Sequence, residues 1–224
     1  MDTLSIPSGK PYRGAPMEGI VAAWYAKHTA KLAADFTACA RMVAEHLMPG
    51  AEVLEVATGP GYLAVELAKF GRYRISGIDI SRSFVRMAAE YAQKSGVEVE
   101  FRHGDAASLP YPADSFDFLV CRAAFKNFSD PVAALREMHR VLRPGGKALV
   151  IDMRRDASNE AIDSTVDAMH LSRIGALLTR AIFKYSLRRR AYSKEDFQRM
   201  AAATPFGSAD IQEAPIGFNV WLRK

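Results

Sequence analysis

The sequence is poor in the residues that build disulfide networks and metal sites, and it lacks any long apolar run. Cysteine occurs only twice in 224 residues, too few for the disulfide framework of a small secreted domain. Neither cysteine stands in a His/Cys spacing typical of structural zinc, so we predict no metal site. No apolar stretch approaches the roughly 20 residues that cross a bilayer, and residues 1–10 lack the apolar centre of a signal peptide. These absences predict a cytoplasmic protein with no membrane partner.

Positive charge is present in moderate excess. The formal net charge is +5, and much of it falls in the segment 173–190, on Arg173, Arg180, Lys184, Arg188, Arg189 and Arg190. These cations form either a solvated helix face whose end complements the helix dipole or a patch for an anionic substrate or partner. The sequence leaves both interpretations open.

The most informative segment is a glycine loop between an apolar strand pattern and a helix pattern. Residues 53–56 form the strand pattern, and Gly59 and Gly61 follow it directly. Glycine lets a ligand approach the bare backbone and tolerates the positive φ of a tight turn. Ala57 stands where a dinucleotide-binding fingerprint has its first glycine. The loop alone is therefore consistent with a nucleotide-like ligand or with a simple turn.

A second strand pattern makes the ligand interpretation stronger. Residues 73–80 are largely apolar and include Asp79 near their end, about 20 residues after the glycine loop. An acid at that spacing can accept hydrogen bonds from two ribose hydroxyls. Loop and acid together predict a site for an adenosine-type cofactor.

Strand and helix patterns alternate through the middle of the chain, which predicts a parallel sheet with right-handed crossovers. We expect a helical start over 18–47, with breaks near Thr29 and Asp35, and helices over 157–187 and 193–203. The other expected elements are strands near 52–57, 73–80, 97–102, 116–121, 147–152, 209–213 and 217–222, and helices near 60–70, 81–95 and 130–142.

Four motifs in this order resemble those of the class I S-adenosylmethionine-dependent methyltransferases. They are residues 55–61, Asp79, residues 104–117 with Gly104-Asp105-Ala106 at their start, and residues 135–146. The resemblance covers roughly residues 40–155. It is nearest to the ubiquinone/menaquinone C-methyltransferase-like group of small-molecule enzymes, in which Ala57 is common, although Lys126 stands where an arginine is usual.

This resemblance implies an α/β fold: a seven-stranded, mostly parallel, Rossmann-like sheet with helices on both faces and a helical cap. It divides the chain into an N-terminal helical cap (1–47), a cofactor-binding α/β core (48–152), a helical cap insertion (153–192) and a C-terminal helix with strands that complete the sheet (193–224). In the family, such cap segments close over the carboxyl ends of the strands.

The resemblance also implies S-adenosylmethionine as cofactor. The residues expected to bind it are Glu55, Ala57, Gly59, Gly61, Asp79, Ile80, Asp105, Ala106, Cys121 and Arg122. Those expected near the acceptor are Tyr25, His28, Phe125, Lys126 and Asn127. For several of these a structural role is an alternative: His28 in its helix, Asn127 as a turn cap and Cys121 as a small apolar residue. Methyl transfer from a sulfonium needs mainly positioning and exclusion of water, so we assign no catalytic residue.

We therefore predict methyl transfer to a small-molecule acceptor, and the basic segment suits an anionic one. One alternative is an RNA or protein methyltransferase that uses residues 173–190, although the chain shows no RNA-binding module and no basic–aromatic interleaving. A second alternative is a dinucleotide-binding oxidoreductase or a nucleotide sensor, against which the missing first glycine argues.

Overall fold

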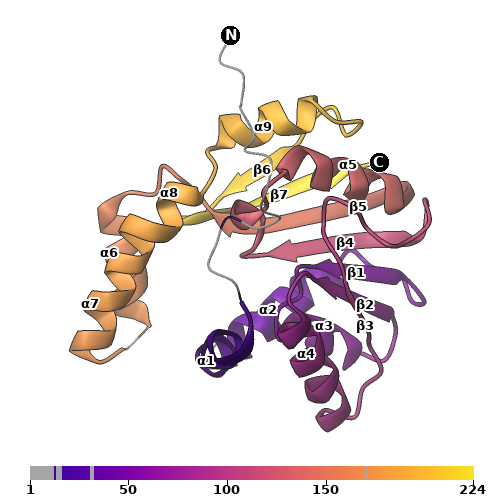
Figure 1. The fold of residues 1–224 in the computed structure, drawn as a ribbon. Coiled ribbons are helices and arrows are strands. Elements are labelled where there is room, and N and C mark those ends of the chain that lie inside the picture. Colours follow the sequence, from indigo (N-terminus) through magenta and orange to yellow (C-terminus); the bar gives the residue numbers. More distant parts are fainter. Residues whose placement is uncertain (1–12, 14–16, 31–32, 170) are drawn as a thin grey trace.

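A single seven-stranded sheet forms the centre of the computed structural model (Figure 1). The structure describes Arg13 and residues 17–30, 33–169 and 171–224. The strand order is β3-β2-β1-β4-β5-β7-β6. The strands are β1 (Glu52–Val56), β2 (Arg74–Asp79), β3 (Glu100–His103), β4 (Phe116–Arg122), β5 (Leu142–Met153), β6 (Asp210–Glu213) and β7 (Gly217–Arg223). The predicted fold class is thus confirmed.

The sheet changes its direction of growth between β1 and β4. Strands β1 to β5 pair in parallel, and β7 runs antiparallel to both β5 and β6. The chain extends outward from β1 through β2 to β3, then returns to place β4 on the other side of β1. In open parallel sheets, ligands bind at the carboxyl ends of the strands beside such a switch point.

Helices cover both faces, and alternate strand residues explain why. Val53 and Phe118 pack against α2 (Ala33–Ala44) and α3 (Tyr62–Ala68), whereas their neighbours Leu54 and Leu119 belong to the opposite core with α5 (Pro131–Val141) and α9 (Lys194–Ala202). Helix α4 (Arg82–Lys94) contacts α3, β2 and β3. Strands buried on both faces need apolar residues at successive positions, which accounts for their nearly continuous apolar runs.

Side-chain caps set several helix starts. Asp130 accepts a hydrogen bond from the backbone N–H of Ala133 with Pro131 in the first turn of α5, and Ser81 accepts one from Phe84 at the start of α4. Ser193 and Asp196 form a reciprocal capping box on α9. These elements agree with the predicted helices near 81–95, 130–142 and 193–203 to within a few residues.

Two strands begin elsewhere than predicted. β3 starts at Glu100, later than the predicted 97, and β5 starts at Leu142 instead of 147. Leu142 pairs with Phe116 and Lys147 with Phe118, so residues 143–146 bulge out of register while the strand continues around them. The four residues left between the predicted helix and the predicted strand thus form a bulge within β5.

Further helices stand outside these layers (Figure 1). They are α1 (Gly19–Thr29), α6 (Asn159–Ala168), α7 (Arg173–Ala181), the π-helical η3 (Ile182–Leu187) and α8 (Arg188–Arg190). The short η2 (Phe125–Asn127), by contrast, follows β4 and is buried. Ile162 and Val166 of α6 form a separate small core with Met153, Ala157 and Ala191. Within the described ranges, no helix has the length and apolar character needed to cross a bilayer.

The predicted helix over 18–47 divides into α1 and α2, near the predicted breaks. Part of the proposed N-terminal cap, residues 1–12, 14–16 and 31–32, lies outside the described residues.

Candidate functional site

A cavity of about 850 Å³ lies at the carboxyl ends of β1, β2, β4 and β5, with α1 and η3 at its border. It therefore occupies the switch point of the sheet. The predicted residues that line it are Tyr25, Glu55, Ala57, Gly59, Asp79, Ile80, Asp105, Ala106, Arg122, Lys126 and Asn127. Residues from five separate stretches of chain thus meet in one space.

The glycine loop borders this cavity with its backbone in the left-handed region. The φ angles are 59° at Ala57, 56° at Gly59 and 81° at Gly61. A Cβ added at Gly59 would meet no atom within 4 Å, whereas one at Gly61 would come within 2.7 Å of the Cβ of Ala88 in α4. Gly59 therefore presents bare backbone to open space, as a close-fitting ligand requires. Gly61 lets α3 approach α4 and does not line the cavity.

Asp79 ties this loop to the end of β2. One carboxylate oxygen accepts a hydrogen bond from the backbone N–H of Gly59 and the other from that of Ser81, both at 2.8 Å. Burial raises the pKa of the Asp79 carboxyl, and these two hydrogen bonds oppose the rise. Each carboxylate oxygen keeps a further acceptor position, which leaves Asp79 able to bind hydroxyl groups of a ligand.

Glu55 is the second buried acid at the cavity. Its Oε2 accepts hydrogen bonds from the hydroxyl of Thr58 (2.6 Å) and the backbone N–H of Ala64 (2.9 Å). Burial raises the pKa of Glu55 to about 8, although these donors and the guanidinium of Arg122 favour the charged form. The carboxyl is therefore mostly protonated at neutral pH, and a cation beside it would favour ionisation.

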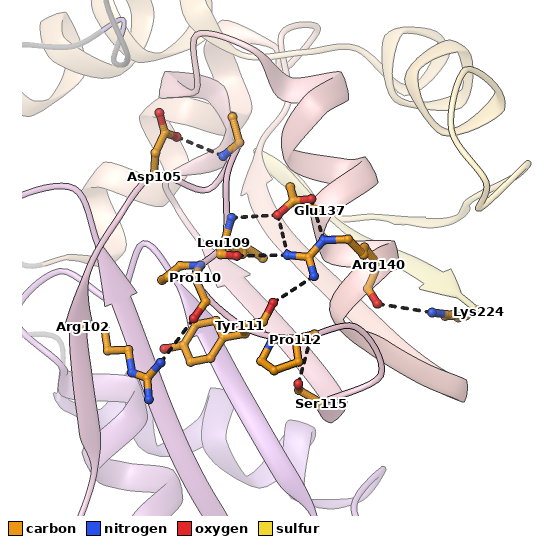
Figure 2. Close-up of polar contacts among 11 residues, drawn as sticks. Arg102, Asp105, Leu109, Pro110, Tyr111, Pro112, Ser115, Glu137, Arg140 and Lys224 are labelled. Atoms are coloured by element: carbon orange, nitrogen blue, oxygen red, sulfur yellow. Dashed lines mark hydrogen bonds and ion pairs between the residues drawn. The ribbon is translucent and has the colours of Figure 1, made fainter.

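The loop after β3 carries Asp105 to the cavity and is braced from outside. Asp105 accepts a hydrogen bond from a backbone N–H two residues further on (2.9 Å). Figure 2 shows the brace: Glu137 accepts a hydrogen bond from the N–H of Leu109 (2.8 Å), and Arg140 donates to the carbonyl of Leu109 (3.0 Å) while pairing with Glu137. Both α5 residues belong to the motif of residues 135–146, in which no role was predicted for either. Their i, i+3 spacing on a helix was the available signal.

A buried ion pair lies where β4 and β5 meet the cavity. The Nζ of Lys126 lies 2.7 Å from Oδ1 of Asp152, with side-chain exposures of 5 % and 2 %, and it also donates to the carbonyl of Ala123. The backbone N–H of Lys126 donates to the other carboxylate oxygen of Asp152 (2.9 Å). Asp152 is not among the predicted site residues, although an acid at the end of an apolar strand is a visible signal in the sequence. The ammonium of Lys126 is thus held by the protein itself.

Asn127 links the cavity to the basic segment. Its side-chain oxygen accepts a hydrogen bond from Arg190 (2.9 Å), which also lines the cavity. Within the same segment, Arg180 and Lys184 pair with Asp163 of α6, and Arg188 donates to two oxygens at the start of α6. The segment is therefore no uniform cationic surface, and Arg190 is its contribution to the cavity.

Three other predicted residues lie away from the cavity lining. Cys121 and Phe125 are fully buried, the ring of Phe125 lying against Phe197. His28 is exposed on α1, where its ring stacks on Trp24 with centroids 4.1 Å apart. Their proposed roles toward cofactor or acceptor stay predictions. Within the part of the chain that the structure describes, no three His, Cys, Asp or Glu side chains gather as metal ligands would.

Comparisons with known proteins identify related chains. A family model described as a methyltransferase domain matches residues 54–150. An uncharacterized methyltransferase of Bacillus subtilis is 33 % identical over 175 residues, which make up 77 % of this chain and 64 % of that protein. A demethylmenaquinone methyltransferase of Deinococcus radiodurans is 38 % identical over 130 residues, 57 % of this chain and 54 % of that protein. The chain thus spans between half and two thirds of the length of these two relatives.

The fold has solved counterparts. A structure from Methanococcus maripaludis, described as an S-adenosyl-L-methionine-dependent methyltransferase, superposes on 96 % of this chain and 97 % of its own with a TM-score of 0.77 at 21 % identity. At that identity the likeness concerns the fold alone. The matched domain, the two relatives and the shared fold together support a class I S-adenosylmethionine-dependent methyltransferase, with S-adenosylmethionine as the implied cofactor.

Proposed function

We propose that the chain transfers a methyl group from S-adenosylmethionine to a small-molecule acceptor by in-line displacement. The observation that carries this proposal is the meeting of the Gly59 loop, Asp79 and Asp105 around one cavity at the switch point of the sheet. Open space at Gly59 suits close approach of a cofactor to the backbone. The two acids suit its hydroxyl and amino groups.

When bound, the cofactor supplies an activated methyl group on a sulfonium, and the protein has to position it and exclude water. We assign the ribose to Asp79, the adenine side to Asp105 and Ala106, and the charged amino-acid part to the region of Glu55 and Arg122. The acceptor side then consists of the Lys126–Asp152 pair, Asn127 and Arg190. These residues hold polar groups of the acceptor, and none of them is needed as a covalent catalyst.

The lining of the acceptor side supports an apolar ring compound with a polar substituent. Phe36, Phe183, Leu187 and Ile216 contribute apolar surface, and Arg190 contributes a cation. A relative with 38 % identity is named a demethylmenaquinone methyltransferase. We therefore propose a quinone-type acceptor. A cavity of about 850 Å³ also suits a small molecule better than an RNA or protein chain.

We further propose that α1 and the segment 153–192 act as the cap over this cavity. Tyr25 and Thr29 of α1 and Phe183 and Leu187 of η3 all line it. Lids of this kind become ordered around ligands and shield the chemistry from water. Amide hydrogen exchange should slow in these helices when cofactor and acceptor bind, while β5 stays protected throughout. Equal protection of cap and sheet without ligand would contradict the lid.

Calorimetric titration with S-adenosylhomocysteine tests the cofactor assignment. Asp79→Ala should weaken binding by about 1.5–3 kcal/mol, the usual value of a hydrogen bond to a charged group. Gly59→Val should abolish binding, because a branched side chain would enter the open space beside the loop. Asp117→Ala is the matched control: this acid also accepts a backbone N–H, from Glu52, but lies at the start of β4. Binding of NAD by the wild type, or unchanged isotherms for both site variants, would refute the assignment.

Methyl transfer itself needs a separate assay. The wild type should transfer a labelled methyl group to a demethylated naphthoquinone. Arg190→Gln should lose this transfer but keep its affinity for the cofactor, which would support the proposed acceptor side. Transfer to RNA or protein but to no small molecule would favour the alternative.

A further inference from the structure

One face of the helical segment 173–190 is exposed and apolar. Its side chains are Ile174, Leu177, Leu178, Ile182 and Tyr185, with exposures between 46 % and 74 %. Their spacing of three, four and eight residues places them along one side of α7 and η3. Other side chains of the same helices, such as Phe183 and Leu187, pack against the small core of α6. We refer to the exposed set as the α7 apolar face.

Helix α1 carries a second exposed apolar set. Ile20 is 88 % exposed and Trp24 is 57 % exposed, with Val21 between them. Both helical regions border the same cavity, since Tyr25 of α1 and Phe183 of η3 line it. The exposed set of α1 and the η3 part of the α7 apolar face therefore belong to elements that flank the cavity.

The charges on these elements are of one sign. The sequences of α1, α7, η3 and α8 contain no acidic residue. Arg173 and Arg189 are exposed at the two ends of the α7 apolar face. The nearby acids Asp163 and Asp167 lie on α6 and are paired with Arg180 and Lys184. An exposed apolar row with cations at both ends is the pattern of helices that lie in a lipid–water interface.

We infer that the α7 apolar face, together with the exposed residues of α1, docks on an anionic lipid surface. A second copy of the chain fits less well: whether two such faces pair in parallel or antiparallel, Arg173 and Arg189 meet cations of the other copy. A nucleic acid would leave the apolar row exposed. The sequence predicts no membrane partner because it has no apolar run long enough to span a bilayer. Docking on a lipid surface needs only a shallow apolar face, so that prediction does not exclude it. The inference is independent of the acceptor proposed above.

Docking at this place gives the cavity access to the lipid phase. Trp24 would then move from water to the interfacial region that indole prefers. The chain has only two tryptophans, and Trp221 is buried. In a Trp221→Phe variant, the tryptophan emission, excited selectively over tyrosine, therefore comes from Trp24 alone.

Vesicle flotation and Trp24 emission test the inference. Vesicles of phosphatidylcholine are compared with vesicles in which about one third of the lipid is phosphatidylglycerol. We expect binding and a blue shift with the anionic vesicles, both lost at high salt. Two double variants should each lower the partitioning of the protein onto anionic vesicles by about tenfold or more. Leu177→Gln/Leu178→Gln removes apolar contact. Arg173→Gln/Arg189→Gln removes two surface cations, each of which contributes about fivefold.

Met48→Gln/Phe70→Gln is the matched control. Both side chains are exposed and apolar but precede β1 and β2, at the opposite end of the strands from the cavity. This variant should bind vesicles like the wild type. Equal loss in the control, no binding by the wild type, or a solution dimer that the leucine variant breaks would each overturn the inference. Titration with S-adenosylhomocysteine, unchanged in all these variants, separates this outcome from failure of the proposed function.

Discussion

The sheet layers and the helical segment 159–190 differ sharply in how they are held. In the sheet, side chains such as Leu54 and Leu119 are fully buried, one toward each face. Among the described residues of the helical segment, only Ile162 and Val166 of α6 are buried, and α7, η3 and α8 bury none of their side chains. Stability against local opening follows buried apolar contact. The sheet should therefore resist local opening better than the helical segment, which reaches the proposed acceptor side through Arg190.

Two lysine–aspartate pairs should show the largest difference in stability between the sheet and the helical segment. Lys126–Asp152 is almost fully buried at the carboxyl ends of β4 and β5, and Lys184–Asp163 in the helical segment is partly exposed. Lys126→Met leaves a carboxylate buried without its partner and should reduce the free energy of unfolding by about 3–5 kcal/mol. Lys184→Met should reduce it by less than about 1 kcal/mol. Urea denaturation of both variants measures the contrast, and similar losses would contradict it.

A pair of leucines tests apolar packing in the same way. Leu119→Ala in β4 removes a fully buried side chain and should cost about 2–5 kcal/mol. Leu178→Ala on α7, where the side chain is 58 % exposed, should change stability by no more than about 0.5 kcal/mol. Thermal unfolding in the absence of lipid provides the measurement. A large loss in the α7 variant would mean that this face packs against protein in solution.

The pH dependence of stability tests how completely the Glu55 carboxyl is buried beside the proposed cofactor site. Its pKa is raised to about 8 in the folded chain, from about 4.3 in an unfolded one. Between these values the folded state holds a proton that the unfolded state has lost, so stability should fall as pH rises, by at most about 1.4 kcal/mol per pH unit. Glu55→Gln should remove most of that slope between pH 5 and pH 8. Parallel stability–pH curves for variant and wild type would show that water reaches the carboxyl.

Helix caps give the smallest contrast. Ser193 starts α9 with a reciprocal capping box, and Ser172 starts α7 with a single hydrogen bond to the N–H of Gly175. Ser193→Ala should cost about 1 kcal/mol of global stability. Ser172→Ala should loosen α7 locally, seen as faster amide exchange in 173–181, with little change in the global transition. A global loss in both variants would argue that α7 unfolds with the sheet.

The order of strands and helices, the glycine loop and Asp79 were predictable because each is written in a short stretch of sequence. Alternating apolar runs, a glycine at positive φ and an acid at the end of a strand are local signals. The contacts of Asp152 with Lys126, 26 residues apart, and of Asn127 with Arg190, 63 residues apart, were not predictable. Such pairs depend on where the chain crosses in space. The separate role of Gly61, set by the approach of α4, has the same cause.

The hydrogen bond between Asp79 and Gly59 has a consequence for the thermodynamics of binding. It holds the loop in its left-handed conformation, so we expect the conformational entropy of ordering that loop to be lost during folding. A ligand that meets a preorganised loop loses less entropy on association. Entry of the cofactor should therefore be limited mainly by diffusion and desolvation. Any slow step before methyl transfer would then arise in the helices α7, η3 and α8, which have few buried contacts to hold them in place.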